Sequence, residues 1–265
     1  MIVQLPYGKE NLELSIPDRH FLQTLLPNEV QTDLVGTEEV IRALEHPIGT
    51  ERLKDLVSPG QKVAIVTSDI TRPLPFTFIV NVILDEKKRI RRCVAGHFIK
   101  AHREGCRFLD QLYKIQIPHR ADIVIVSAGG YPKDINLYQA QKALDNAKHA
   151  VKDGGCILWA ASSKEGLGAE VFEKWMTGHE KAHDMIEHIS REFQLGGHKA
   201  AAIAMVLEKA DIYLYSDMDA DFVRSIHLKP CQDLQAELDS ALSRYGENAS
   251  VIVMPYGGST LPCTK

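Results

Sequence analysis

The sequence lacks several features that would each assign it to a special class of protein. It has no excess of basic charge, because 31 Lys and Arg stand against 35 Asp and Glu for a formal net charge of -4. We therefore expect no nucleic-acid partner. It has no apolar run of the roughly 20 residues that a membrane-spanning helix needs. Met1 is not followed by a secretory signal pattern, and no internal repeat or low-complexity tract is present. We expect neither a membrane partner nor a string of small modules.

Paired cysteine motifs are also absent. The five cysteines are odd in number, widely spaced and without a Cys-x-x-Cys pair. This pattern is typical of reduced thiols, so we expect a cytoplasmic protein. Cys106 and Cys156 lie in apolar sequence contexts, and we expect both to be buried.

The residues that are present favour an α/β fold. Apolar side chains make up 45% of the chain, which is enough for a substantial core. Strands alternating with helices predict a Rossmann-like, mostly parallel sheet with helices on both faces. The predicted strands are 123–127, 156–161, 212–216 and 251–254, and the predicted helices are 135–151, 168–176, 180–193, 197–209 and 232–245.

The first part of the chain is less regular. Residues 2–17 alternate as a hairpin that turns at 7–10. Short helices at 38–45 and 51–57, strands at 78–84 and 89–96 and a helix at 99–113 follow. The helix predicted at 135–151 is expected to end at Gly154-Gly155, because glycine commonly ends helices.

Residues 63–75, VAIVTSDITRPLP, form a buried-type strand that breaks into Asp69, Ile70, Thr71 and Arg72. Ligands of open α/β sheets bind beyond the carboxyl ends of the strands. A guanidinium on a proline-stiffened turn can grip a carboxylate or phosphate with two hydrogen bonds. The alternative is that Ser68 or Asp69 caps a helix while Arg72 is solvated.

A second segment has the order strand, glycine turn, helix. The run ending at Ser127 is followed by Gly129-Gly130 and then by helical periodicity. Such turns let the backbone approach an anion at a helix N-terminus. Gln139 and Lys142 lie three residues apart and so share a helix face, with Tyr138 beside them. These side chains suit a small oxygen-rich anion, and a solvated helix face is the alternative.

These segments together resemble the nickel-dependent lactate racemase family. The resemblance rests on IVTSDITRP, on HRADIVIVSAGGYPKDINLYQAQKAL, on LGGHKA and on the opening LPYGK, and it covers nearly the whole chain. It implies two α/β domains and a nickel pincer nucleotide that takes a hydride from a 2-hydroxy acid and returns it to the other face. It also implies that Asp69, Ile70, Thr71 and Arg72 contact the cofactor, and that Tyr138, Gln139 and Lys142 bind the substrate, with Lys142 and Gln139 on its carboxylate and hydroxyl.

The chain departs from the family pattern after Pro75. There the family carries a central segment with a Gly-Thr-His-Arg motif, two catalytic histidines, the cofactor-attaching lysine and a nickel-binding histidine. Here Pro75 is followed directly by Phe76, and Gly-Thr-His-Arg occurs nowhere. We therefore assign no catalytic and no metal-binding residue, and expect impaired racemisation because no base serves either face of the substrate. A non-catalytic remnant that binds a carboxylate or phosphate is the alternative.

The same gap bears on domain organisation. We expect residues 1–75 to be the remnant of the first domain and 76–265 to form the second. The alternative, which the resemblance implies, is that the remnant packs back onto the second half, because both chain ends of the family contribute to one domain. Apolar surface exposed by the missing segment would favour self-association.

His179-Glu180-Lys181-Ala182-His183 fits His-Glu-x-x-His, a zinc-hydrolase pattern with two histidines one helical turn apart. The segment is strongly charged and only three of its positions are fixed. We therefore favour a solvated helix face over a zinc site.

Overall fold

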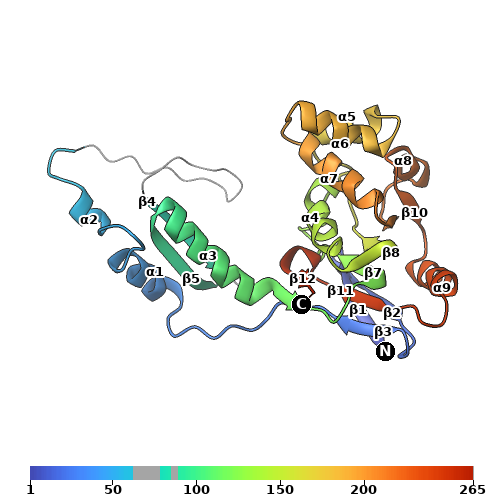
Figure 1. Cartoon of the computed structure of the whole chain (residues 1–265), viewed down its shortest axis with the longest axis horizontal. Coiled ribbons are helices and arrows are strands. Elements are labelled where there is room, and N and C mark those ends of the chain that lie inside the picture. The colour runs from blue at the N-terminus through green and yellow to red at the C-terminus, as the bar shows by residue number, and fades with distance from the viewer. Residues whose placement is uncertain (62–77, 85–88, 265) are drawn as a thin grey trace. The chain divides into compact units, whose positions relative to one another are not determined.

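The computed structural model describes residues 1–61, 78–84 and 89–264 and divides the chain into two compact units (Figure 1). Unit 1 comprises Met1–Pro27 and Tyr113–Lys265, and unit 2 comprises Asn28–Leu112. The boundary expected at Pro75 lies outside the described residues. The two units divide at 27/28 and 112/113, and the first 27 residues belong to the same unit as the second half of the chain.

Unit 1 is built on one six-stranded sheet in which every described pairing is parallel. The strand order is β10-β9-β8-β7-β11-β3. Its strands are β3 (Phe21–Thr24), β7 (Ala121–Ser127), β8 (Val151–Ala160), β9 (Asp211–Tyr215), β10 (Lys229–Cys231) and β11 (Val251–Met254). The chain winds from β7 through β10 in one direction, and β11 pairs on the other side of β7. This confirms the predicted α/β, mostly parallel fold.

Alternation along the strands divides the core between the two faces of the sheet. Val124, Val126 and Trp159 belong to one buried cluster, whereas Ile123 and Ile125 belong to the other. Strands buried on both faces read as continuous apolar runs, and successive side chains point to opposite faces.

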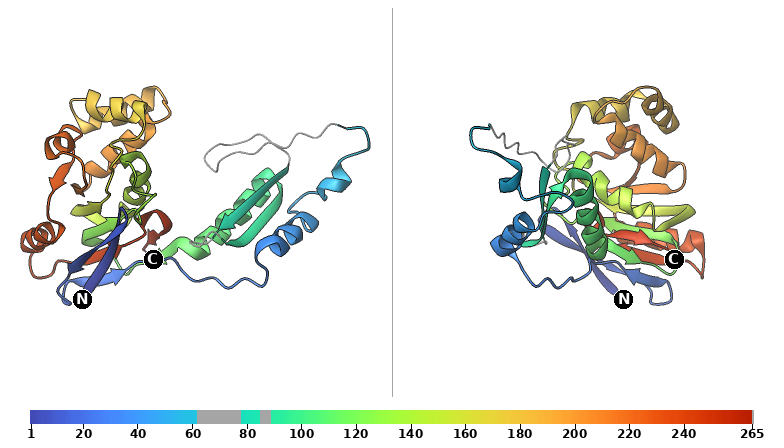
Figure 2. Two further views of the ribbon diagram at one scale, coloured as in Figure 1. Left: turned by 180° about the vertical axis from the view of Figure 1, so that it is seen from behind. Right: turned by 60° about the vertical axis from the view of Figure 1, so that its left-hand side comes forward.

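Helices cover both faces of this sheet (Figures 1 and 2). One face packs against α4 (Leu137–Ala147), α5 (Glu170–Gly178), α6 (Ala182–Arg191), α7 (Gly197–Leu207) and α8 (Ala220–Ser225). The other packs against α9 (Leu234–Tyr245) and the hairpin of β1 (Ile2–Tyr7) and β2 (Glu10–Ser15). The hairpin is antiparallel, as predicted, with Tyr7 opposite Glu10.

Two short strands and a 3₁₀ turn complete unit 1. β6 (Lys114–Gln116) pairs in parallel with β12 (Leu261–Cys263), and η1 (Gly257–Ser259) precedes β12. Asn146 of α4 donates to the carbonyl of Gly257 at 2.7 Å, so this segment packs against α4.

Two sequence expectations were wrong in detail. The helix predicted at 135–151 ends at Ala147, because Val151 already pairs with Ala121 at the start of β8. Gly154, with φ of 78°, lies inside this irregular strand rather than after a helix. Cys156 is buried as expected, but Cys106 is exposed on α3.

Unit 2 packs helices against a hairpin. Its elements are α1 (Gly36–Glu45), α2 (Leu53–Leu56), β4 (Phe78–Leu84), β5 (Ile90–His97) and α3 (Phe98–Tyr113), whose last residue belongs to unit 1. Glu39 of α1 is only 2% exposed and accepts two hydrogen bonds from Arg42, at 2.7 and 2.8 Å. The N–H of Cys93 also donates to it, at 2.9 Å. A buried carboxylate paired in this way fixes α1 on β5.

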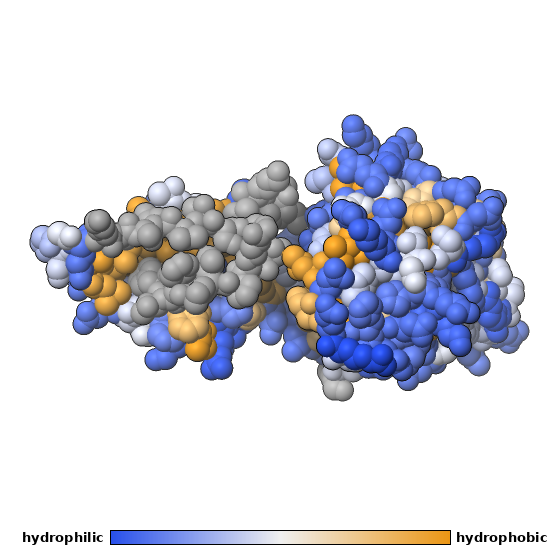
Figure 3. Space-filling model, turned by 90° about the horizontal axis from the view of Figure 1, so that it is seen from above, coloured by the Kyte–Doolittle hydropathy of each residue, from blue (hydrophilic) through white to orange (hydrophobic). Residues whose placement is uncertain are grey.

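No helix within the described parts of the chain is long and apolar enough to cross a membrane. Apolar side chains do reach the surface of unit 2, where Figure 3 shows orange groups among blue ones. Leu53, Leu56 and Val57 are exposed there, as are Val80 and Val82 of β4. Self-association through such a surface stays a prediction.

Candidate functional site

The candidate anion-binding side chains lie in the first turns of α4. Asn136 caps this helix, and its side chain accepts from the N–H of Gln139 at 3.0 Å. Leu137 and Ala140 are buried against the sheet, so Gln139 and Lys142 project to the exposed side. The Lys142 ammonium donates to Oε1 of Gln139 at 3.0 Å. The two side chains therefore share a face, as their spacing predicts.

Tyr138 connects α4 to two neighbouring helices. Its ring meets Phe172 of α5 edge-on, with centroids 5.6 Å apart. The Lys199 ammonium of α7 lies 4.3 Å from the Tyr138 ring centroid and donates to the Tyr138 carbonyl at 2.8 Å. The packing of α4 against α7 thus brings a second lysine to the residues selected from the sequence.

Lys199 is held in an environment that disfavours its charge. Burial, followed by the positive charge of Lys142, lowers the pKa of Lys199 to about 8, against a smaller opposing effect of Asp145. Asp145 is itself paired with Lys148 at 2.6 Å. The Lys142 charge thus reaches Lys199, while the Lys142 ammonium itself bonds to Gln139 and the Lys199 ammonium to the Tyr138 carbonyl.

His198 precedes this lysine at the start of α7. Its Nδ1 accepts from the N–H of Gly196 at 3.1 Å, and its ring stacks on Phe193 with centroids 5.8 Å apart. Burial and the adjacent Lys199 lower the pKa of His198. The ring thus holds the turn that precedes α7, next to Lys199.

The glycine turn after β7 has a different role from the one its pattern predicts. A Cβ on Gly130 would lie 2.9 Å from the carbonyl oxygen of Gly8, and that carbonyl accepts from the N–H of Tyr131 at 2.6 Å. The buried Asp134 also accepts from the N–H of Gly8, at 2.7 Å. In the structure the absence of a side chain on Gly130 lets the hairpin of β1 and β2 pack closely against this turn, where the sequence pattern predicts an anion.

The other predicted sites have separate outcomes. Asp69, Ile70, Thr71 and Arg72 lie outside the described residues. His179 follows the last residue of α5 whereas His183 lies in α6, so the two histidines are not on one helix. His179 Nε2 instead faces His188 Nδ1 at 3.0 Å, and His183 Nδ1 faces Glu208 at 2.5 Å.

The described parts of the chain contain no cluster of metal-binding side chains. No group of three or more His, Cys, Asp or Glu side chains there is placed to hold a metal ion. The described residues therefore do not fit a nickel or zinc ion.

The parallel sheet covered by helices on both faces defines an α/β protein, and the candidate residues lie on α4 and α7. Comparisons with known proteins specify the family. Residues 117–261 match the family model described as "Lactate racemase C-terminal domain", and residues 7–94 match "Lactate racemase N-terminal domain". The chain belongs to the lactate racemase family.

Two curated relatives of the chain carry the same family name. The chain is 33% identical to a lactate racemase of Thermoanaerobacterium thermosaccharolyticum over 69% of this chain and 44% of the relative. It is 31% identical to a lactate racemase of Lactiplantibacillus plantarum over 70% of this chain and 45% of the relative. The chain thus spans less than half the length of these relatives.

A solved structure shares the fold. The lactate racemase apoprotein from Thermoanaerobacterium thermosaccharolyticum superposes with a TM-score of 0.80 at 20% identity, covering 99% of this chain and 100% of that one.

Sequence reasoning missed Lys199. One signal could have indicated it: the lysine lies in the first turn of a helix, where the helix dipole disfavours a cation. A lysine whose charge destabilises the start of a helix is a candidate residue for binding an anion.

Proposed function

We propose that this chain binds a small 2-hydroxy acid, such as lactate, through Lys142 and Gln139. The observation that carries the proposal is that Lys142 and Gln139 share the exposed face of α4, with Lys199 near enough for the Lys142 charge to lower its pKa. The Lys142 ammonium would hold the carboxylate, and the Gln139 amide would bond the hydroxyl. The names of the curated relatives support lactate as the first ligand to test.

We further propose that this chain alone does not racemise the acid it binds. In the family resemblance, a nickel pincer nucleotide supplies the hydride acceptor and two histidines move the hydroxyl proton. Gly-Thr-His-Arg is absent from the sequence, and the described residues do not fit a metal. These absences favour a non-catalytic binding protein.

The binding test compares two ligands on three variants. Lys142→Ala should weaken both lactate and propionate by roughly 10- to 150-fold, because a charge-assisted hydrogen bond contributes about 1.5 to 3 kcal/mol. Gln139→Ala should weaken lactate alone, because propionate has no hydroxyl. Lys174→Ala is the control, since Lys174 is an exposed lysine paired with Glu170 on α5. Ligand-observed NMR titration is the measurement, and unchanged lactate binding by Lys142→Ala would overturn the assignment.

Turnover is tested separately. D-lactate incubated with the purified chain, with and without nickel, should give no L-lactate in a chiral assay. Conversion by the purified chain would contradict the non-catalytic proposal while leaving the binding assignment intact.

A further inference from the structure

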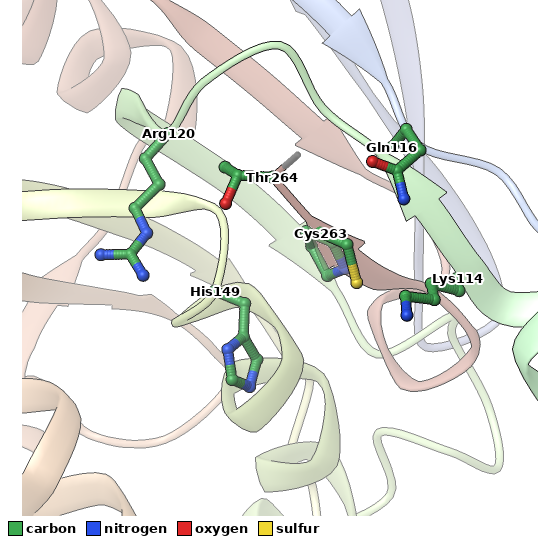
Figure 4. Close-up of a pocket in the computed structure, with 7 residues that line it drawn as sticks. Lys114, Gln116, Arg120, His149, Cys263 and Thr264 are labelled. Atoms are coloured by element: carbon green, nitrogen blue, oxygen red, sulfur yellow. The ribbon is translucent and has the colours of Figure 1, made fainter.

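The position of a cavity relative to the sheet bears on its role, because ligands of open α/β sheets bind beyond the carboxyl ends of the strands. A cavity of about 620 Å³, beside β6, β12 and the turns that hold Arg120 and His149, lies near the amino end of β7 (Figure 4). A smaller cavity, of about 230 Å³, lies at the carboxyl ends of β9 and β10. The smaller cavity therefore has the position expected of a binding site.

Segments that are far apart in the sequence form this smaller cavity. The ends of β9 and β10, the turn after β9 and helix α8 surround it, and Tyr7 at the end of β1 completes the lining. Its described lining includes none of the α4 and α7 side chains that we propose for the 2-hydroxy acid. The cavity is thus a separate site.

Much of the lining is apolar or aromatic. Leu214, Val223 and Cys231 are buried there. Burial raises the pKa of the Cys231 thiol to about 12, so the thiol adds no charge to the cavity. The rings of Tyr7 and Tyr215 lie next to one another, with centroids 5.1 Å apart and planes tilted by 57°. Such a lining suits a ligand with a small apolar body, and the two ring faces can also contact a cation.

Asp217 is the charged side chain of the described lining, and two hydroxyl groups fix its orientation. Its Oδ1 accepts from the Tyr7 hydroxyl at 2.7 Å, and its Oδ2 accepts from the Ser162 hydroxyl at 2.6 Å. Burial, then the hydrogen bond to Asp217 and its charge, raise the pKa of Tyr7, so Tyr7 stays a donor. A carboxylate has about four lone-pair sites, so these bonds leave acceptor capacity for a ligand.

The charges around the cavity favour a cation over an anion. Lys164 Nζ lies 3.9 Å from Asp217 Oδ2, beyond hydrogen-bond distance, and its side chain is 74% exposed, so water screens much of its charge. Lys229, which precedes the lining residue Pro230, is paired with Asp211 at 2.7 Å. Two further carboxylates, the caps of α8 and α9 at Asp219 and Asp233, directly adjoin lining residues in the chain.

We propose that this cavity binds a small organic ammonium ion. The ammonium group donates to Asp217, while the rings of Tyr7 and Tyr215 contact the cation and its methylene groups. The volume of about 230 Å³ lies below the range of roughly 300 to 1,000 Å³ that is usual for drug-sized ligands. The ligand is therefore of the size of a short alkylammonium ion.

Butylammonium is the probe for the first experiment, with an NMR titration of the isotope-labelled chain as the readout. Asp217→Asn should weaken its binding about tenfold or more, because the substitution removes a charge-assisted hydrogen bond at nearly constant shape. Asp221→Asn is the matched control, since Asp221 is an exposed carboxylate of α8 that is paired with Arg224. Equal binding by Asp217→Asn and the unchanged chain would overturn the proposal.

A second comparison uses the unchanged chain alone, and it remains informative if Asp217→Asn folds poorly. Butan-1-ol has the same apolar chain without the charge, so it should bind about tenfold more weakly than butylammonium, or weaker still. Equal binding of the two would show that the cavity selects only an apolar body and would contradict the proposal. Shifted signals at Gln139 and Lys142 instead of at Tyr7 and Tyr215 would place the ion on α4 and overturn it as well.

Discussion

Lys199 is a cation at a position where three physical effects oppose its charge. The α7 dipole, partial burial and the neighbouring Lys142 ammonium all disfavour protonation, and its contacts with Tyr138 compensate only in part. A residue that reduces stability in this way has a function as its simplest explanation. A bound anion would relieve the repulsion between the two lysines.

The pH dependence of stability tests this residue. The pKa of Lys199 is about 8 in the folded chain, below its value of 10.5 in the unfolded chain. The unfolded state therefore binds more protons between these values, and the free energy of unfolding should rise with pH from about 8 to 10.5, by at most about 3 kcal/mol. Lys199→Met should abolish this rise, whereas Lys174→Met should preserve it. Urea titrations across the window measure both, and identical slopes in the two variants would contradict the pKa assignment.

The site residues differ in how far the sequence could predict them. Gln139 and Lys142 share a face because helix periodicity alone places them so, and the 3.0 Å bond between them confirms it. Lys199 lies 57 positions beyond Lys142 in the chain. Its approach depends on the packing of α4 against α7, which no local pattern encodes.

The elements were predictable in proportion to their length and burial. The central strands β7, β9 and β11 and the second half of β8 are buried apolar runs, and these parts were expected within a few residues of their observed positions. The short strands β3, β6, β10 and β12 were missed, because three or four residues show no period. The break between α5 and α6 was expected at 177–179 and lies at 179–181, and it separates His179 from His183.

A pair of adjacent glycines tests the packing of η1 between β7 and α4. A Cβ on Gly257 would lie 2.4 Å from Val126 Cγ2 and 2.8 Å from the Ala143 Cβ, whereas one on Gly258 would meet nothing within 4 Å. Gly257→Ala should reduce the free energy of unfolding by about 1 to 3 kcal/mol through overpacking. Gly258→Ala should change it by less than about 0.5 kcal/mol. Chemical denaturation measures both, and equal stabilities would show that η1 is not packed as described.

At the scale of the whole molecule, unit 2 is an insertion between two segments of unit 1. The sequence analysis placed contiguous domains first and the packing of the first part onto the second half as the alternative, but no local pattern marks the bounds 27/28 and 112/113. The first 27 residues belong with the second half through the pairing of β3 with β11 and the hydrogen bonds of the hairpin to the turn after β7.

Removing the insertion tests the division. Within unit 1 the Gln23 amide donates to the carbonyl of Gln116 at 3.4 Å, so the two segments lie close together. Residues 1–27 joined to 113–265 by a glycine-serine linker of about six residues should fold cooperatively, because the sheet and both core clusters are retained. Circular dichroism and the near-ultraviolet signal of the buried Trp159 measure this. An unfolded or aggregated product would show that unit 1 requires residues 28–112.

The position of β11 sets an order of events during synthesis on the ribosome. β11 lies between β7 and β3, so the first strand of the sheet has no partner until the last tenth of the chain has been translated. Unit 2 is contiguous and has all its residues available much earlier, and domains generally fold as units as they emerge. Unit 2 can therefore fold before unit 1. During that time the hairpin of β1 and β2 has no completed sheet to pack against.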